Sequence, residues 1–170
     1  MHDTFRLDAD HFQFYLEDRA IPHDTSLLWN TPLAGQRLDT LDGLLAIGIA
    51  RWGQDTAVTI ERGESSPATD NLDAWDCIIE ASIRTISGQV HLTTPEGDDA
   101  RAPVISIAPG WYRVRVYYGQ LRSVVDELAS HGADTYRLTI WPSDPSVPRI
   151  VALQDLPDNK SGSTASESPG

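Results

Sequence analysis

Five histidines and one cysteine are the side chains in this sequence best suited to act as bases, nucleophiles or metal ligands. The histidines lie far apart, at His2, His11, His23, His91 and His131. None forms a His-x-x-x-His pair or another pair with metal-ligand spacing. Cys77 stands alone in an apolar strand pattern, so no internal disulfide and no cysteine-based zinc cluster can form, and a core residue is favoured over a nucleophile. The sequence thus predicts no metal and no cofactor.

Acidic side chains give two further patterns. His11 stands beside Asp10 and six positions before Glu17, so a fold that joins them would place an imidazole base among carboxylates. An enzyme with a dispersed site around His11 is therefore one hypothesis, and a surface or structural histidine is the other. The pairs Asp98-Asp99 and Asp39-x-x-Asp42 lack the ligand order of a calcium loop, which favours solvated charge.

The charge balance restricts the class of partner. The chain has 25 acidic and 13 basic residues and a formal net charge of −12. Such a surface repels phosphate backbones and anionic lipid, which disfavours direct binding of nucleic acid or membrane. It would attract a basic protein. The residues predicted to contact that partner are Asp8, Asp10, His11, Glu17 and Asp18.

Residues 109–118 have the clearest structural pattern among the elements that must position these side chains. After Pro109-Gly110, one face holds Tyr112, Val114, Val116 and Tyr118, and the other holds Trp111, Arg113, Arg115 and Tyr117. This alternation predicts a strand with a core face and a wet, cationic face. The Pro-Gly pair predicts a type II turn, which suits a crossing between two sheets better than a tight hairpin. Tyr112 fits a corner tyrosine whose hydroxyl bonds to the backbone.

Further short strands are predicted by alternation or by apolar runs. They span residues 5 or 11 to 17, 44–50, 56–61, 75–86, 89–93, 104–107 and 135–141. Leu121, Val124, Val125 and Leu128 have helical spacing and predict one short helix. The pattern is typical of an all-β antiparallel β-sandwich of about seven or eight strands, with a closed β-barrel as the alternative.

Domain organisation and compartment follow from composition. Residues 1–156 are predicted to form a single domain, and the Ser-, Gly- and Pro-rich residues 157–170 a disordered polar tail. The first residues lack the basic and apolar stretches of a signal peptide. The apolar run at 44–50 is far shorter than the roughly 20 residues that span a bilayer. With a lone cysteine, these features favour the cytoplasm.

Three short segments also carry a family resemblance. Residues 10–14 are similar to a His-Gln-Phe strand, residues 109–114 to a Pro-x-Gly-x-Tyr strand, and residues 134–138 to a final Asp-Thr-Tyr strand. In this order and approximate spacing they resemble the competence protein J family, although Phe12 stands where the family has histidine. The resemblance implies a small cytosolic β-sandwich that binds and inhibits a partner nuclease.

Three functional hypotheses therefore remain open. The first is an acidic protein-binding module, an inhibitor or immunity protein for a basic partner such as a nuclease or toxin. The second is the enzyme with a dispersed site around His11. The third is a β-sandwich that binds a small ligand or carbohydrate through an exposed Trp111 or Trp141. A flat acidic face around exposed aromatic side chains would favour the first, and a deep polar pocket the second or third.

Overall fold

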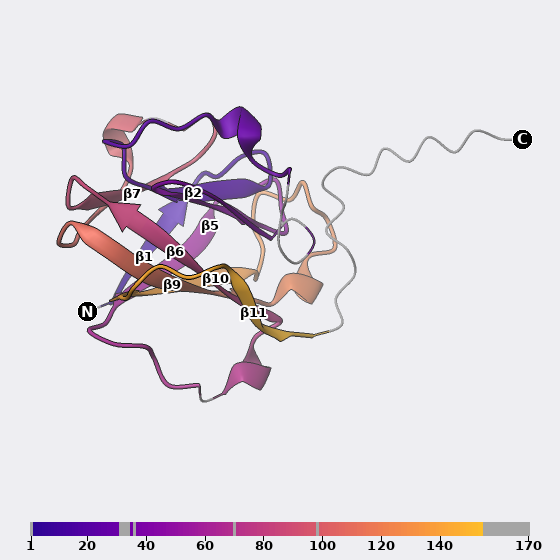
Figure 1. Cartoon of the computed structure of the whole chain (residues 1–170). Coiled ribbons are helices and arrows are strands. Elements are labelled where there is room, and N and C mark those ends of the chain that lie inside the picture. Colours follow the sequence, from indigo (N-terminus) through magenta and orange to yellow (C-terminus); the bar gives the residue numbers. More distant parts are fainter. Residues whose placement is uncertain (1, 31–34, 36, 70, 98, 155–170) are drawn as a thin grey trace, which may run out of the picture.

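The computed structural model describes residues 2–30, 35, 37–69, 71–97 and 99–154, and it shows two β-sheets packed face to face (Figure 1). The first sheet has the strand order β1 (His2–Leu7), β5 (Thr56–Arg62), β10 (Thr135–Pro142), β9 (Gly110–Gly119), β6 (Cys77–Thr85) and β11 (Arg149–Leu153). The second has the order β3 (Leu38–Leu41), β4 (Leu44–Gly48), β2 (Gln13–Glu17), β7 (Gln89–Thr93) and β8 (Val104–Ser106). Neighbouring strands are antiparallel, except that β5 and β10 run parallel.

The all-β sandwich is confirmed, and the predicted strand count was too low. Among the described residues there are eleven strands, and neither sheet closes on itself, so the β-barrel alternative was wrong. The apolar run at 44–50 becomes β4, which is buried on both faces. One face of β4 packs into the core between the sheets. The other packs in a small cluster with Tyr15, Leu28 and Trp29. The strands predicted from 56, 75, 89, 104 and 135 appear as β5, β6, β7, β8 and β10.

In strand β9 the predicted core face is confirmed, but the prediction that the other face is wet was wrong. The core side chains are Tyr112, Val114, Val116 and Tyr118. On the opposite face Arg113 and Arg115 are only 4% and 1% exposed, so that face is cationic but not wet. Both arginines pair with Glu80 of β6, with Arg115 Nε 2.7 Å from Oε1 and Arg113 Nε 3.5 Å from Oε2.

Two segments cover this face: the one after β10 contacts Arg113, and the loop after β5 contacts Arg115, which donates to the Ala68 carbonyl at 3.3 Å. Arg113 donates to the carbonyl oxygens of Ser146 and Val147 at 2.9 and 3.0 Å, and Arg149 of β11 donates to Glu80 at 2.9 Å. Alternation shows that two faces of a strand differ, but it does not show what packs on the polar one. The short strand β11 has no such alternation, and the sequence did not predict it.

The predicted strand near the start is in fact two strands in different sheets. A continuous strand from Phe5 was wrong, because β1 ends at Leu7 and β2 begins at Gln13. Between them the chain turns at Asp10, whose carbonyl accepts from the Gln13 N–H at 3.2 Å. His11 and Phe12 have φ of +53° and +59°, which a strand does not allow. Phe12 is therefore a turn residue.

The predicted helix at 121–128 was also wrong. The described residues hold no α-helix, only 3₁₀ turns at η1 (Thr25–Leu27), η2 (Leu72–Ala74), η3 (Asp99–Arg101) and η4 (Leu121–Ser123). Leu121 packs against the core, but Val125 and Leu128 are 97% and 70% exposed, so the four apolar residues do not pack as one helical face. A helix of two turns is marginal without tertiary packing, and its β-branched valines have low helix propensity.

The Pro109-Gly110 segment crosses between the sheets, as predicted. It connects β8 of the five-stranded sheet to β9 of the six-stranded sheet, and Gly110 has φ +150°. The Tyr112 hydroxyl donates to the Ala108 carbonyl at 2.7 Å, which confirms the corner tyrosine. The predicted tail, 157–170, lies outside the described residues. In the part described, no helix is long and apolar enough to cross a membrane.

Candidate functional site

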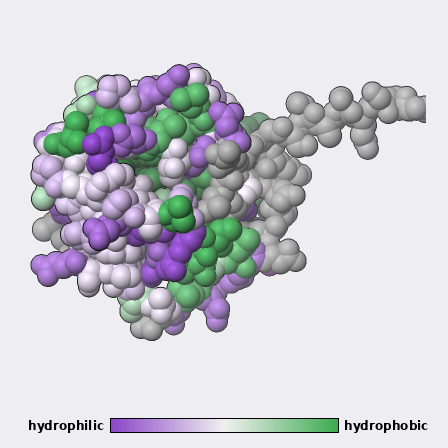
Figure 2. Space-filling model, in the orientation of Figure 1, coloured by the Kyte–Doolittle hydropathy of each residue, from purple (hydrophilic) through white to green (hydrophobic). Residues whose placement is uncertain are grey.

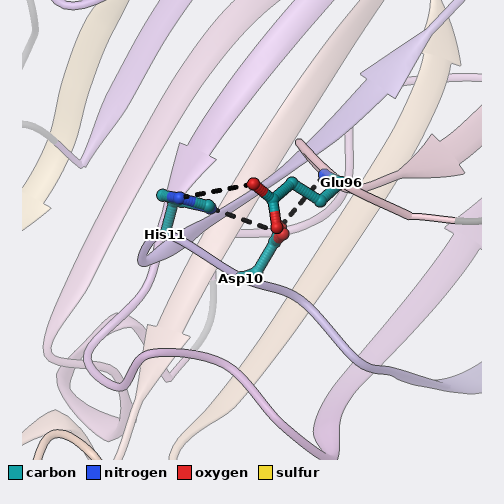
Figure 3. A group of neighbouring side chains, drawn as sticks. All are labelled: Asp10, His11 and Glu96. Carbon is teal, nitrogen blue, oxygen red and sulfur yellow. Dashed lines mark hydrogen bonds and ion pairs between the residues drawn. The ribbon is translucent and has the colours of Figure 1, made fainter.

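The turn between β1 and β2 brings two predicted site residues together with one that was not predicted (Figure 3). Asp10 and His11 lie beside Glu96, which comes from the connection between β7 and β8. The His11 Nδ1 atom is 3.4 Å from Asp10 Oδ2, and its Nε2 is 3.9 Å from Glu96 Oε1. The Glu96 backbone N–H donates to Asp10 Oδ1 at 3.4 Å. The His11 imidazole therefore sits between two carboxylates.

Trp52 holds this turn in place. Its carbonyl accepts from the Phe12 N–H at 3.1 Å, and its own N–H donates to the Glu127 carbonyl at 2.6 Å. The indole ring lies 4.7 Å from the His11 ring and 5.5 Å from the Phe12 ring, between centroids. Trp52 is still 37% exposed, so the same ring that supports the turn is open to solvent.

A groove of about 460 Å³ runs beside Trp52, and we call it the acidic groove. Its lining residues are Asp8, Ala9, Asp10, Trp52, Gln54, Asp55, Ser130 and His131. His131 Nδ1 lies 2.9 Å from Asp55 Oδ2, and Arg6 Nη1 lies 3.3 Å from Asp55 Oδ1. The hydrogen bond to His131, with the nearby Arg6 charge, lowers the pKa of Asp55 below its usual value. Asp8 Oδ1 accepts from the Asp55 N–H at 3.3 Å.

A buried polar network fixes the wall that carries Trp52 and Asp55. Arg51 is 1% exposed, and its Nε donates to Asp134 Oδ1 at 2.6 Å. The Tyr136 hydroxyl donates to Asp134 Oδ2 at 2.9 Å and accepts from the Ala50 N–H at 2.8 Å. Burial, followed by the Asp134 charge, raises the pKa of Tyr136 well above its usual value. The phenol therefore stays protonated as a donor.

Glu17 lies outside the acidic groove, on the outer face of the five-stranded sheet. Its side chain is 16% exposed; Oε1 accepts from Thr93 Oγ1 at 2.8 Å, and Oε2 lies 3.4 Å from His23 Nε2. Tyr15 lies on the same face. Burial, with the charges of Asp10 and Glu17, raises the pKa of Tyr15 to about 12. Glu17 is held by Thr93 of β7 and by His23 of the connection after β2.

Asp18 is fully buried and has a structural environment. Its Oδ2 accepts from Thr85 Oγ1 at 2.7 Å and from the N–H groups of Ile86 and Ser87 at 2.7 and 2.9 Å. Its Oδ1 accepts from Ser87 Oγ and the Ala20 N–H, both at 2.8 Å. Burial alone would raise the pKa of Asp18, but these donors hold it well below its usual value. The carboxylate ties the β6–β7 turn to β2.

Several other residues singled out from the sequence have environments typical of structural residues. Cys77 is buried, and burial raises the pKa of its thiol to about 11. Asp39 accepts from the Trp29 N–H, and Asp42 pairs with Arg84. Asp98 lies outside the described residues.

The chemistry available at the Asp10–His11–Glu96 group is limited. In the described residues it is the one set of three His, Cys, Asp or Glu ligand atoms within 4.8 Å of one another, and its oxygen and nitrogen donors suit a borderline or hard divalent cation. The imidazole could also move a proton. No described hydroxyl or thiol is hydrogen-bonded to His11, so the group shows no activated nucleophile.

Comparison with known proteins places the fold. No protein-family model matches the sequence, and no similar curated protein was found. The structure is similar to that of ComJ from Bacillus subtilis, described as an inhibitor of the DNA degrading activity of NucA, with a TM-score of 0.59 and 9% identity over 83% of this chain and 96% of ComJ. It is also similar to a protein described as crocagin biosynthetic gene J, with a TM-score of 0.56 and 19% identity. That match covers 85% of this chain and 98% of the other. At these identities the likeness concerns the fold, and the distant resemblance to the competence protein J family is confirmed at that level.

Proposed function

We propose that this protein is a binding module that inhibits a basic protein partner, and that the partner is a nuclease. The observation that carries the proposal is the exposed Trp52 ring in a groove lined by Asp8, Asp10 and Asp55. Exposed tryptophan is among the residues that contribute most to protein interfaces. Surrounding carboxylates attract a cationic partner and repel phosphate backbones.

The remaining features fit binding better than catalysis. The net charge of −12 would increase the association rate with a basic protein. ComJ, whose fold is similar, is described as an inhibitor of a nuclease. We assign the partner surface to Asp8, Asp10, His11 and Trp52. Glu17 is not assigned to it, because its side chain is only 16% exposed and does not line the acidic groove. Asp18 is left out because none of its surface is exposed. We place the protein in the cytoplasm, without direct contact to nucleic acid or membrane.

The experiment begins with capture of partners from the native host at low salt, followed by a DNA-degradation assay on each purified basic protein with and without this chain. We expect one captured nuclease to lose activity. Association should slow as salt rises from about 0.05 to 0.5 M, because the Debye length shrinks about threefold. Trp52→Ala should weaken inhibition by at least roughly tenfold, the effect of one interface hot spot.

Trp111→Ala is the matched control, since Trp111 is also exposed but lies outside the acidic groove. It should leave inhibition unchanged. Asp8→Asn with Asp10→Asn should lower the association rate more than it raises the dissociation rate. Capture of no basic protein, or turnover of a small molecule that depends on His11, would refute the proposal and favour the enzyme hypothesis.

A further inference from the structure

A second groove, larger than the acidic one, lies between the β3–β4 turn and the outer face of the six-stranded sheet. It encloses about 800 Å³, and we call it the Trp111 groove after the aromatic side chain that lines it. Asp42 and Thr40 contribute from the turn side, and Arg84 and Ser82 from β6. It shares no lining residue with the acidic groove. On the face that Figure 2 shows, hydrophobic and hydrophilic residues lie next to one another.

Trp111 offers an exposed aromatic side chain on a backbone that is held in the sheet. It stands at the start of β9, directly opposite Arg84 in the β6–β9 ladder, and its carbonyl accepts from the Ser143 N–H at 3.2 Å. The residue is 41% exposed. Trp141, the other tryptophan considered from the sequence, is 6% exposed, with the Arg115 guanidinium 5.7 Å from its ring. Of these two, Trp111 is the one a ligand can reach.

Beside this side chain lies a planar ion pair. Arg84 Nε donates to Asp42 Oδ1 at 3.0 Å, and Nη2 donates to Oδ2 at 2.6 Å, so both groups are held in a bidentate geometry. The side chains are still 37% and 54% exposed. Two of the five guanidinium N–H bonds are used in this pair, and the carboxylate oxygens keep free lone-pair directions. The pair therefore offers fixed donors and acceptors while its net charge is zero.

We propose that the Trp111 groove binds a neutral oligosaccharide. A pyranose ring has a face of C–H groups that packs on an indole ring and a rim of hydroxyls that both donate and accept. The indole, the Arg84–Asp42 pair and the Thr40 hydroxyl supply these complementary groups on one surface. A pair with no net charge matches an uncharged ligand, whereas a phosphate or an ammonium ligand would need an unpaired countercharge.

The test follows the indole N–H signal of Trp111 by ¹H–¹⁵N NMR while cellotetraose, maltotetraose, mannotetraose or N-acetylchitotetraose is added. We expect one of these probes to shift that signal with a dissociation constant of about 1 mM or tighter. Trp111→Ala should abolish binding of that probe, and Arg84→Lys, which keeps the charge but loses the bidentate fork, should weaken it about tenfold.

Trp52→Ala is the matched control and should bind the sugar as the wild type does. Urea unfolding of each variant separates lost binding from lost folding. Absence of any shift at Trp111 with all four probes overturns the proposal, and so does sugar binding that survives Trp111→Ala. Because inhibition of a partner depends on Trp52 and not on Trp111, either proposal can fail while the other holds.

Discussion

Replacing Asp18 by asparagine tests whether this residue acts in the fold or at a partner surface. The carboxylate accepts five hydrogen bonds, three from backbone N–H groups and two from hydroxyls. An asparagine amide offers one oxygen and places two N–H bonds where an acceptor stood. With the amide nitrogen at the Oδ1 position, the Ser87 hydroxyl can turn to accept, but the Ala20 N–H loses its partner. Asp18→Asn therefore leaves one partly buried donor without its partner and three bonds without charge assistance.

The magnitude follows from these losses. A partly buried donor that loses its partner costs at most about 1 kcal/mol, and each charge-assisted bond that becomes neutral loses roughly 1 kcal/mol. Since these terms are not additive, we expect a loss of about 2–4 kcal/mol in the free energy of unfolding, measured from urea midpoints at pH 7. Glu64→Gln, at an exposed glutamate, is the control and should change it by less than about 0.5 kcal/mol.

The pH dependence gives a second readout for the same variant. The folded-state pKa of Asp18 is lowered, so its stabilisation is complete above the unfolded pKa of about 3.9 and is lost as the pH falls through the lower folded value. The wild type should lose stability below about pH 4, and Asp18→Asn should lose less over that range. A variant as stable as the control, with an unchanged acid profile, would refute the structural role.

Two further predictions concern stability. Arg113→Ala should lower the free energy of unfolding by about 2–4 kcal/mol in urea, because it removes one cation from buried Glu80 and leaves the Val147 carbonyl without its donor, whereas Val125→Ala, at a residue 97% exposed, should cost less than about 0.5 kcal/mol. If residues 1–156 form the domain, deleting residues 157–170 should change the free energy of unfolding in urea by less than about 0.5 kcal/mol. A larger loss of stability would mean that the tail docks on the sandwich.

Strand alternation predicts the fold well where one face packs into the core. Strand β9 shows this, because its four core side chains stand at every second position from Tyr112 to Tyr118. That pattern can be seen without knowing which distant residues pack on them. It fails for Arg113 and Arg115, since burial of their face depends on residues 143–153 and on the loop at Pro67 and Ala68, which carry no pattern of their own. The helix failed for the related reason that apolar spacing at 121–128 does not ensure a packing partner.

The candidate site was predictable only in part. Asp8, Asp10 and His11 could be singled out because they lie close together in a chain with excess negative charge. Trp52, Asp55, Glu96 and His131 were missed, because they reach the same surface from three other connections and no spacing links them. Asp18 was included among the partner contacts because of its position in the sequence. It is next to Glu17 in sequence, but its side chain turns inward to the β6–β7 turn.

The parallel pairing of β5 with β10 has a consequence for how the chain is made. Ala57 pairs with Thr135, and Arg62 with Ile140. At a synthesis rate of roughly 5–20 residues per second, these roughly 80 intervening residues leave one edge of β5 without its neighbour for about 4–16 s. During that time β1 can already cover the other edge, since it precedes β5 on the ribosome. A chain truncated before residue 135 should therefore expose unpaired strand edges and be prone to aggregate or recruit a chaperone, whereas one that includes residues 135–154 should not.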